Sequence, residues 1–404
     1  MKYMMIIADG MADERLLELH GKTPLCYAST KTLDRLARRS EIGFVRTVPS
    51  GMQAGSDVAG LTILGYDPLK YYTGRAPIEL LGLVPQKQEN FCLGKGDYAY
   101  RMNLVTLSEE EPFEKKRMLD HTAGQISTKE SKEIIKNMQN LFDRMAYQYY
   151  TETSYRHLLV GRQMGIEGLI PPHDILEKTI EPYLPKEKKL RLFMEESYRI
   201  LNDCSINEER RKQGKRPANS IWVWGGGEEL QLENFFTKYE KRGAMISAVA
   251  VFRGIANGSG MTNLTVQGAT GTVDTNYGEK AKRAIEALLY APYDFVCLHV
   301  EAPDEASHRG DLQGKIHAIE QIDQKIIQPI VEAVEKSEEE VRILILPDHY
   351  TFVRTKVHGN LPVPYLLYDS RRSIGSFLAY NEVQADSGNV ISNGIRLIEK
   401  LFSE

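Results

Sequence analysis

The stretch VRILILPDHY, residues 341–350, ends an apolar run with an aspartate and a histidine side by side. Such a run is typical of a parallel strand that is covered on both faces. Neighbouring side chains of a regular strand point to opposite faces, so Asp348 and His349 can reach one place only if the chain leaves the strand at Pro347. Taken alone, the pair is explained by a polar turn. It indicates a metal site only if other strands end in the same way.

Further apolar runs predict more strands. They lie at residues 3–7, 42–48, 220–225, 244–252 and 294–300. Segments with apolar residues at helical spacing separate several of these runs, as in the stretch GSDVAGLTILGY. Strands that alternate with helices predict an α/β fold with a doubly wound, mainly parallel sheet.

The middle of the chain has a different pattern. Residues 88–188 are more polar, and their strand patterns are weaker and more alternating, as in YRHLLVG. We therefore expect a smaller inserted α+β domain at 88–188. The core domain would then comprise residues 1–87 and 189–404.

Composition excludes several classes of protein. A net charge of −4 over 404 residues argues against a nucleic-acid binder that relies on overall positive charge. The 4 cysteines stand singly, which argues against a thiolate zinc site. No segment has the roughly 20 apolar residues of a membrane helix, and the N-terminus has no export signal. We expect a cytoplasmic protein that does not bind membranes. The sequence gives no indication of its oligomeric state.

Polar residues follow several of the predicted strands. Ligands of open α/β sheets bind outside the carboxyl ends of the strands, so these residues are candidates for one site. They are Asp9, Ser56, Asp304, His308, Asp348, His349 and His358. Each one singly could be a turn residue or a helix cap. Together, carboxylates and imidazoles suit two divalent ions, and a serine that opens a helix lies where a phosphate is stabilised.

The chain resembles a known family in several long motifs. They are ADGMAD, GSDVAGLTILGYDPLKYYTGRAP, SYRHLLV, PPHDILEK, ANSIWVWG, GATGTVDTNY, HVEAPDEASHRGDLQGKI and LPDHYT. These motifs resemble those of the archaeal-type cofactor-independent phosphoglycerate mutases, which belong to the alkaline phosphatase superfamily. The chain also resembles a bacterial branch of this family labelled as proposed homoserine kinases.

This resemblance implies an alkaline-phosphatase-like core and a two-metal mechanism. One ion would be held by Asp9, Ser56, Asp348 and His349, and the other by Asp304, His308 and His358. We expect Mn²⁺, with Zn²⁺, Mg²⁺ or Co²⁺ as alternatives, and neither a nucleotide nor 2,3-bisphosphoglycerate. The catalytic Ser56 would take the phosphate of phosphoglycerate as phosphoserine and return it to the other hydroxyl. This reaction interconverts 3-phosphoglycerate and 2-phosphoglycerate in glycolysis and gluconeogenesis.

The insertion is expected to close over the small phosphorylated substrate. Candidate substrate-binding residues are Arg75, Arg156, His157, His173 and Asp174. For the PPHD motif, a rigid loop that caps a helix is an equal alternative. The sequence departs from the family pattern at Gly60, Gln125, Tyr350 and Leu361. These departures affect the identity of the substrate more than the chemistry.

Two other activities share the same residues. A homoserine kinase-like phosphotransferase would use a different acceptor, although the chain has no Walker-type GxxxxGK[ST] motif for ATP. A phosphomonoesterase would let water take the phosphate. A scaffold protein without catalytic activity would not need all seven of the residues that follow the predicted strands, from Asp9 to His358.

Overall fold

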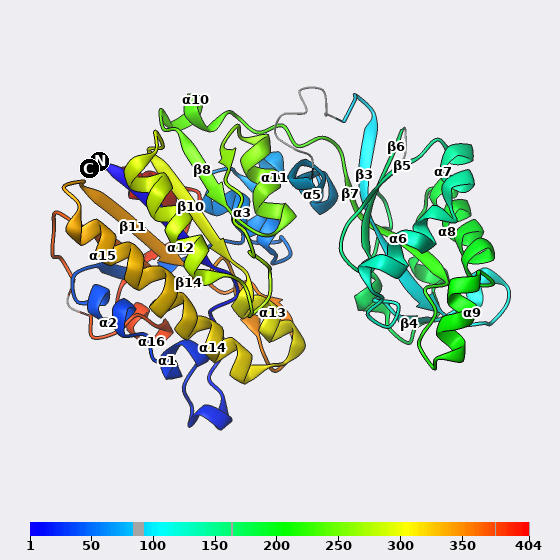
Figure 1. Ribbon diagram of the computed structural model, residues 1–404, viewed down its shortest axis with the longest axis horizontal. Coiled ribbons are helices and arrows are strands. Elements are labelled where there is room, and N and C mark those ends of the chain that lie inside the picture. The colour runs from blue at the N-terminus through cyan, green and yellow to red at the C-terminus, as the bar shows by residue number, and fades with distance from the viewer. Residues whose placement is uncertain (84–92, 163–164, 376, 404) are drawn as a thin grey trace. The chain divides into compact units, whose positions relative to one another are not determined.

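The structure is a computed structural model that describes residues 1–83, 93–162, 165–375 and 377–403 (Figure 1). The chain forms two compact units. The core unit comprises residues 1–72, 81–87 and 231–404, and the second unit comprises residues 73–80 and 88–230. No helix of the described residues is long and apolar enough to cross a membrane.

The core unit is built on an eight-stranded sheet with the order β15-β2-β14-β11-β1-β10-β8-β9. The strands are β1 (Lys2–Ala8), β2 (Glu41–Val45), β8 (Gly243–Ile246), β9 (Thr262–Asn263), β10 (Phe295–Val300), β11 (Val341–Leu346), β14 (Val363–Asp369) and β15 (Asn389–Ile391). Only β14 runs antiparallel to its neighbours in this sheet. Every residue of β10 and β11 is buried, as expected for central strands that are covered on both faces.

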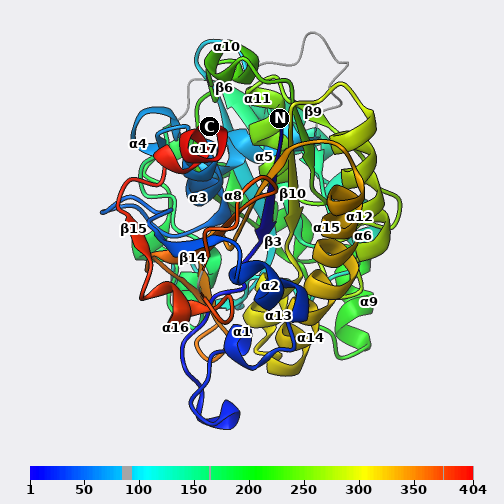
Figure 2. The same cartoon turned by 90° about the vertical axis from the view of Figure 1, so that its left-hand side faces the viewer.

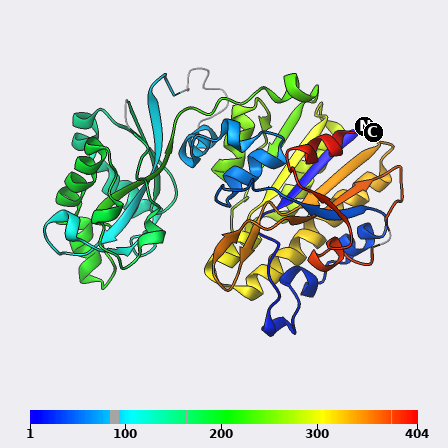
Figure 3. The same cartoon turned by 180° about the vertical axis from the view of Figure 1, so that it is seen from behind.

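Helices cover both faces of this sheet. They include α1 (Pro24–Tyr27), α2 (Lys31–Ala37), α3 (Ser56–Ile63), α4 (Pro68–Tyr71), α10 (Phe235–Tyr239), α11 (Ala250–Gly258), α12 (Tyr277–Ile285), α13 (Ala302–Arg309), α14 (Leu312–Ile322), α15 (Gln328–Lys336), α16 (Glu382–Ala385) and α17 (Arg396–Phe402). Helices α12, α14 and α15 lie on one face (Figure 1), and α3 and α17 lie on the other (Figure 3). The two ends of the chain lie close together in this unit (Figure 2). The centres of the Tyr3 and Phe402 rings are 5.0 Å apart.

The second unit has an antiparallel five-stranded sheet. Its strands are β3 (Asp97–Leu107), β4 (Met118–Asp120), β5 (Gln148–Thr151), β6 (Arg156–Arg162) and β7 (Ser220–Gly227). Its helices include α6 (Thr128–Lys136), α7 (Gln139–Met145), α8 (Lys188–Leu201) and α9 (Ser205–Lys212), and α5 (Arg75–Leu83) begins in this unit. The buried side chains of the sheet and of α6, α7 and α8 form a separate hydrophobic core.

The second unit extends further than the expected 88–188. Strand β7 was expected in the parallel core sheet, but it pairs antiparallel with β3. Helix α8 packs against β7, so the chain stays in the second unit until residue 230. The sequence identified the strand correctly, but its pairing partner is decided by tertiary packing.

This boundary predicts which fragment folds. A fragment of residues 73–230 contains the whole second unit, so we expect a cooperative thermal unfolding transition by circular dichroism. A fragment of residues 73–188 lacks β7 and nearly all of α8, and should show no such transition. A cooperative transition in the shorter fragment would contradict the boundary at residue 230.

Candidate metal centre

The three central strands of the core sheet end at one edge, and an aspartate follows each of them. The register pairs Ala8 with Val300 and Ile7 with Leu346, so β1, β10 and β11 end level with one another. Asp9 follows β1, Asp348 follows β11, and Asp304 lies in α13, which begins after β10. All three carboxylates are buried.

A first cluster of side chains surrounds the serine. Ser56 Oγ lies 3.3 Å from Asp9 Oδ2 and 3.2 Å from His349 Nε2. His349 Nε2 also lies 3.2 Å from Asp348 Oδ2. Gly55 is the N-cap of α3 and Ser56 is the first helical residue, so the serine side chain does not cap the helix. Within the described part of the chain, Asp9 Oδ1 and Asp348 Oδ2 are buried without a hydrogen-bond partner, as expected of oxygens that bind a cation.

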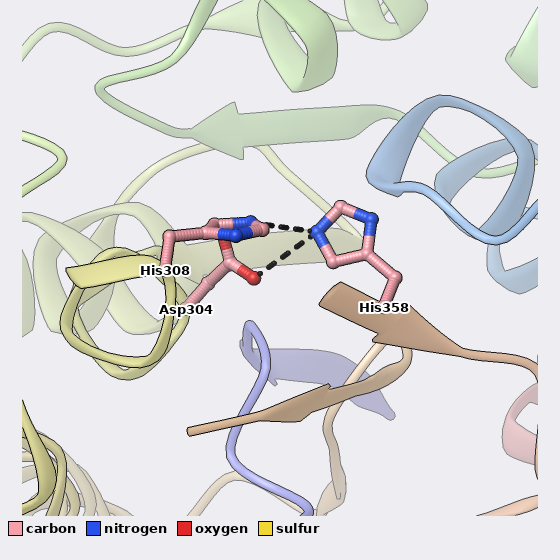
Figure 4. A group of neighbouring side chains, drawn as sticks. All are labelled: Asp304, His308 and His358. Atoms are coloured by element: carbon pink, nitrogen blue, oxygen red, sulfur yellow. Dashed lines mark hydrogen bonds and ion pairs between the residues drawn. The ribbon is translucent and has the colours of Figure 1, made fainter. Parts of the chain in front are cut away.

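A second cluster joins Asp304 to two histidines (Figure 4). The Nε2 atoms of His308 and His358 lie 3.3 Å and 3.4 Å from the carboxylate oxygens of Asp304, and 2.8 Å from each other. At the other side of each ring, Nδ1 faces a backbone carbonyl, that of Lys356 at 2.9 Å or that of Ala54 at 3.2 Å. A carbonyl only accepts hydrogen bonds, so each Nδ1 carries the hydrogen and each Nε2 presents its lone pair to the cluster.

Two lone pairs that face each other need a positive charge between them. A proton can supply it in the absence of an ion. Burial opposes the protonation of His308, but the hydrogen bond to Asp304 and its negative charge outweigh burial and raise the pKa to about 9. A divalent ion fits the same ligand set of two imidazoles and one carboxylate. A second group with metal-binding geometry is formed by Asp9, Asp304 and His349, so Asp304 is placed to serve both positions.

Negative charge dominates the first cluster. Burial raises the pKa of Asp9 well above its ordinary value, and the nearby charges of Asp348 and Asp304 raise it further. Burial alone would also raise the pKa of Asp304, but the neighbouring His308 and His358 hold it well below its usual range. A bound cation would relieve the repulsion among the three carboxylates.

Sequence reasoning missed a fourth histidine. His299 Nε2 lies 2.9 Å from Asp9 Oδ2, and its Nδ1 lies 3.1 Å from Ser247 Oγ. The Asp9 carboxylate accepts, so we infer that Nε2 carries the hydrogen and that Nδ1 accepts from Ser247, whose other acceptor, the Val249 carbonyl, lies farther away at 3.4 Å. Burial and the nearby charge of Lys280 hold the pKa of His299 well below its ordinary value. His299 is thus a neutral donor that orients a ligand. A histidine near the end of the apolar run 294–300 was the available signal.

The predicted substrate residues lie in the second unit and fall into two groups. His157 is buried, with Nε2 2.8 Å from Ser131 Oγ, and burial lowers its pKa to about 3, so we now assign it a structural role. His173 and Asp174 lie in a short 3₁₀ helix, Pro172–Ile175. The centre of the His173 ring lies 5.6 Å from that of the Trp224 ring.

Arg156 shares one face of the second sheet with Arg101, which was not among the predicted residues. Arg156 on β6 pairs with Asn103 on β3, and Arg101 lies two residues from Asn103 on the same face. Arg101 Nε lies 3.0 Å from Glu79 Oε2, and its guanidinium stacks 4.4 Å from the centre of the Trp224 ring. Arg75 binds the other oxygen of Glu79 at 2.8 Å. Arg75, Arg101 and Arg156 therefore bring three planar guanidinium groups to this part of the unit, and such groups can bind a carboxylate or a phosphate through two hydrogen bonds.

Comparison with known proteins gives one consistent result. Residues 37–207 match the family model described as 2,3-bisphosphoglycerate-independent phosphoglycerate mutase. A Geobacter sulfurreducens protein named "Probable 2,3-bisphosphoglycerate-independent phosphoglycerate mutase" is 43% identical over 100% of both chains. A 2,3-bisphosphoglycerate-independent phosphoglycerate mutase of Methanosarcina barkeri is 42% identical over 96% of both chains.

Solved structures agree with this comparison. A Pyrococcus horikoshii protein has a TM-score of 0.79 and 29% identity, covering 99% of this chain and 96% of its own. The cofactor-independent phosphoglycerate mutase of Thermoplasma acidophilum has a TM-score of 0.58 and 22% identity, covering 100% and 99%, which shows the fold alone. The expected α/β class, a core with a mainly parallel sheet and a smaller α+β unit, is confirmed.

The repulsion at Asp9 predicts opposite effects of one substitution with and without metal. In chelated protein, Asp9→Asn should raise the free energy of unfolding by about 1–3 kcal/mol, because it removes a buried like charge. With Mn²⁺ at about 100 times its dissociation constant, the wild type should gain about 2.7 kcal/mol and the variant much less. Urea unfolding of wild type and variant, once with EDTA and once with Mn²⁺, measures the free energy of unfolding in both conditions.

The matched control is Asp13→Asn. Asp13 is also buried, but it forms an ion pair of 2.7 Å with the buried Lys315. Its loss should destabilise the chelated protein, typically by about 3–5 kcal/mol. If Asp9→Asn also destabilised the chelated protein, the three carboxylates would not repel one another as we describe.

Glu152 in the second unit predicts a pH dependence. Burial and the charge of Glu79 raise its pKa to about 7, against the opposing charges of Arg101, Arg156 and Arg75. Between about pH 4.5 and 7 the folded unit keeps a proton that the unfolded chain has lost, so this group's contribution to stability falls as pH rises. Glu152→Gln stays neutral, so its stability relative to wild type should increase over this range, by about 1–3 kcal/mol at pH 8.

Urea unfolding at pH 5, 6, 7 and 8 checks this prediction. The exposed Glu133 on α6 supplies the control, because Glu133→Gln should show a constant difference from wild type at every pH. A constant difference for Glu152→Gln as well would show that Glu152 keeps an ordinary pKa.

Proposed function

Since the chain belongs to the family of 2,3-bisphosphoglycerate-independent phosphoglycerate mutases, we propose that it interconverts 3-phosphoglycerate and 2-phosphoglycerate through a phosphoserine at Ser56. The observation that carries this mechanism is the position of Ser56 Oγ between Asp9 Oδ2 and His349 Nε2 at the start of α3. The activity belongs to glycolysis and gluconeogenesis, and we place it in the cytoplasm.

Ser56 acts as the nucleophile. Its oxygen forms a bond to phosphorus as the bond between phosphorus and the ester oxygen of 3-phosphoglycerate breaks. The 2-hydroxyl of the bound glycerate then attacks the same phosphorus, and the bond to Ser56 breaks. In the first step the serine proton passes to a neighbouring acceptor and the departing 3-oxygen takes up a proton. In the second step the 2-hydroxyl gives up its proton as it attacks, and the departing serine oxygen regains one. The backbone N–H groups at the start of α3 stabilise the phosphate in both steps.

The clustered side chains of the core would hold two divalent ions. Asp9, Ser56, Asp348 and His349 supply one set of ligands, and Asp304, His308 and His358 supply the other, with Mn²⁺ as the proposed metal and Zn²⁺, Mg²⁺ or Co²⁺ as alternatives. When bound, such ions lower the pKa of the serine hydroxyl and neutralise charge on the transferring phosphoryl group. Orphaned carboxylate oxygens and facing imidazole lone pairs support this proposal.

The second unit would supply cations for the charged ends of the substrate. We assign this role to Arg75, Arg156 and Arg101, and we keep His173 and Asp174 as further candidates. Their charges complement the carboxylate and phosphate of phosphoglycerate. Closure of this unit over the substrate stays a prediction.

Ser56→Ala tests the mechanism. We expect turnover of 3-phosphoglycerate to fall at least about 10³-fold, because no other nucleophile replaces the serine. Stability should change by only about 1 kcal/mol for the lost hydrogen bond. Ser259→Ala is the matched control, because the hydroxyl of this buried serine donates to the backbone carbonyls of Ile255 at 2.7 Å and Ala256 at 3.2 Å. Its turnover should match wild type.

Mass spectrometry of quenched Mn²⁺-loaded enzyme should place phosphate on Ser56. Phosphate on another residue, or near wild-type turnover by Ser56→Ala, would contradict the mechanism. An assay panel separates the alternatives. Release of free phosphate without 2-phosphoglycerate would indicate a phosphomonoesterase, and transfer from ATP to homoserine would indicate a homoserine phosphotransferase. Either result would overturn the mutase assignment.

A further inference from the structure

Thr351 contacts both clusters of the metal centre. This buried residue lies on β12 (Tyr350–Phe352), two residues after His349. Its hydroxyl oxygen lies 2.7 Å from Asp304 Oδ1 and 3.2 Å from His349 Nδ1. On the neighbouring strand β13 (Val357–Gly359), its cross-strand partner is His358.

The direction of these hydrogen bonds is fixed by the chemistry of the groups. The Asp304 carboxylate only accepts, so it takes the single hydroxyl hydrogen of Thr351. The bond between His349 Nδ1 and Thr351 must then be donated by the imidazole. His349 Nε2 is left with its lone pair toward Ser56 and Asp348, which is the form that binds a metal.

Thr351 is held in place on every side. Its N–H donates to the Ala12 carbonyl at 3.2 Å, and its own carbonyl accepts from the buried Lys315 at 2.7 Å. Gly10 packs against the hydroxyl, because a Cβ at that position would lie 2.6 Å from Thr351 Oγ1 and 2.8 Å from the Asp304 Cα. Gly10 also has a φ of +63°, so a larger side chain is disfavoured there for two reasons.

We propose that Thr351 is a positioning residue for both metal ions: one hydroxyl sets the tautomer of His349 in the first cluster and the orientation of Asp304 in the second. Loss of the Thr351 hydroxyl therefore weakens the binding of both ions together. Loss of a group that supports a single ligand would weaken binding in one cluster only. The proposal rests on the two-metal part of the proposed function. It does not depend on which phosphorylated compound is the substrate.

Two substitutions separate this role from plain packing. Thr351→Val keeps the shape and strand preference of the side chain but removes the hydroxyl. Thr351→Ser keeps the hydroxyl but removes the methyl group. A positioning role predicts that valine is the worse replacement, and a packing role predicts that serine is. The control is Thr62→Val, which removes a buried hydroxyl that donates only to the Val58 carbonyl at 3.1 Å, within α3.

The test is Mn²⁺ binding to chelated full-length protein, followed by the electron paramagnetic resonance signal of free Mn²⁺. We expect two ions per chain for wild type. Thr351→Val should weaken both by about 10- to 100-fold. Thr351→Ser and Thr62→Val should stay within about threefold of wild type. Circular dichroism of the chelated variants should match wild type, so that the loss is one of binding and not of folding.

Several results would overturn the proposal. They are unchanged binding in Thr351→Val, weakening of only one ion, an equal loss in Thr351→Ser, or fewer than two ions in wild type. The mutase assignment fails separately, because wild type that binds two ions but does not convert 3-phosphoglycerate would leave the role of Thr351 intact.

Discussion

Three buried carboxylates at the end of three neighbouring strands repel one another, and the rest of the centre depends on this constraint. Asp9, Asp304 and Asp348 are brought together because β1, β10 and β11 run parallel and end level at one edge of the sheet. Burial raises the pKa of Asp9 well above its ordinary value, and the nearby charges of Asp348 and Asp304 raise it further. A divalent cation turns the same repulsion into attraction.

The four histidines of the centre have different roles because their Nδ1 neighbours differ. His308 and His358 donate to carbonyls and His349 donates to a hydroxyl, so each presents a lone pair at Nε2. His299 receives a hydrogen from Ser247 instead, so it presents a hydrogen to Asp9. The division into ligands and a supporting donor thus comes from the atoms behind each ring. Residue type and burial alone do not distinguish them.

The sequence was sufficient for the core sheet and for the residues at its edge, because apolar runs and the polar residues that follow them are local features. It was insufficient where partners are far apart in the chain. The run 220–225 forms a strand, but it joins the other sheet. The run 244–252 divides into β8 and α11, because an apolar stretch of this length has no period that separates a strand from a helix. Arg101 was not among the predicted substrate residues, because its partner Glu79 lies far from it in the chain.

Anomalous diffraction at the manganese edge from crystals soaked in Mn²⁺ tests the central claim most directly. The account predicts two peaks per chain. One peak should lie about 2.0–2.3 Å from the Nε2 atoms of His308 and His358, and the other at a similar distance from Nε2 of His349. His299 should bind neither ion and should still contact Asp9. A single peak, or a peak coordinated by His299 Nε2, would contradict the two-metal centre described for this protein.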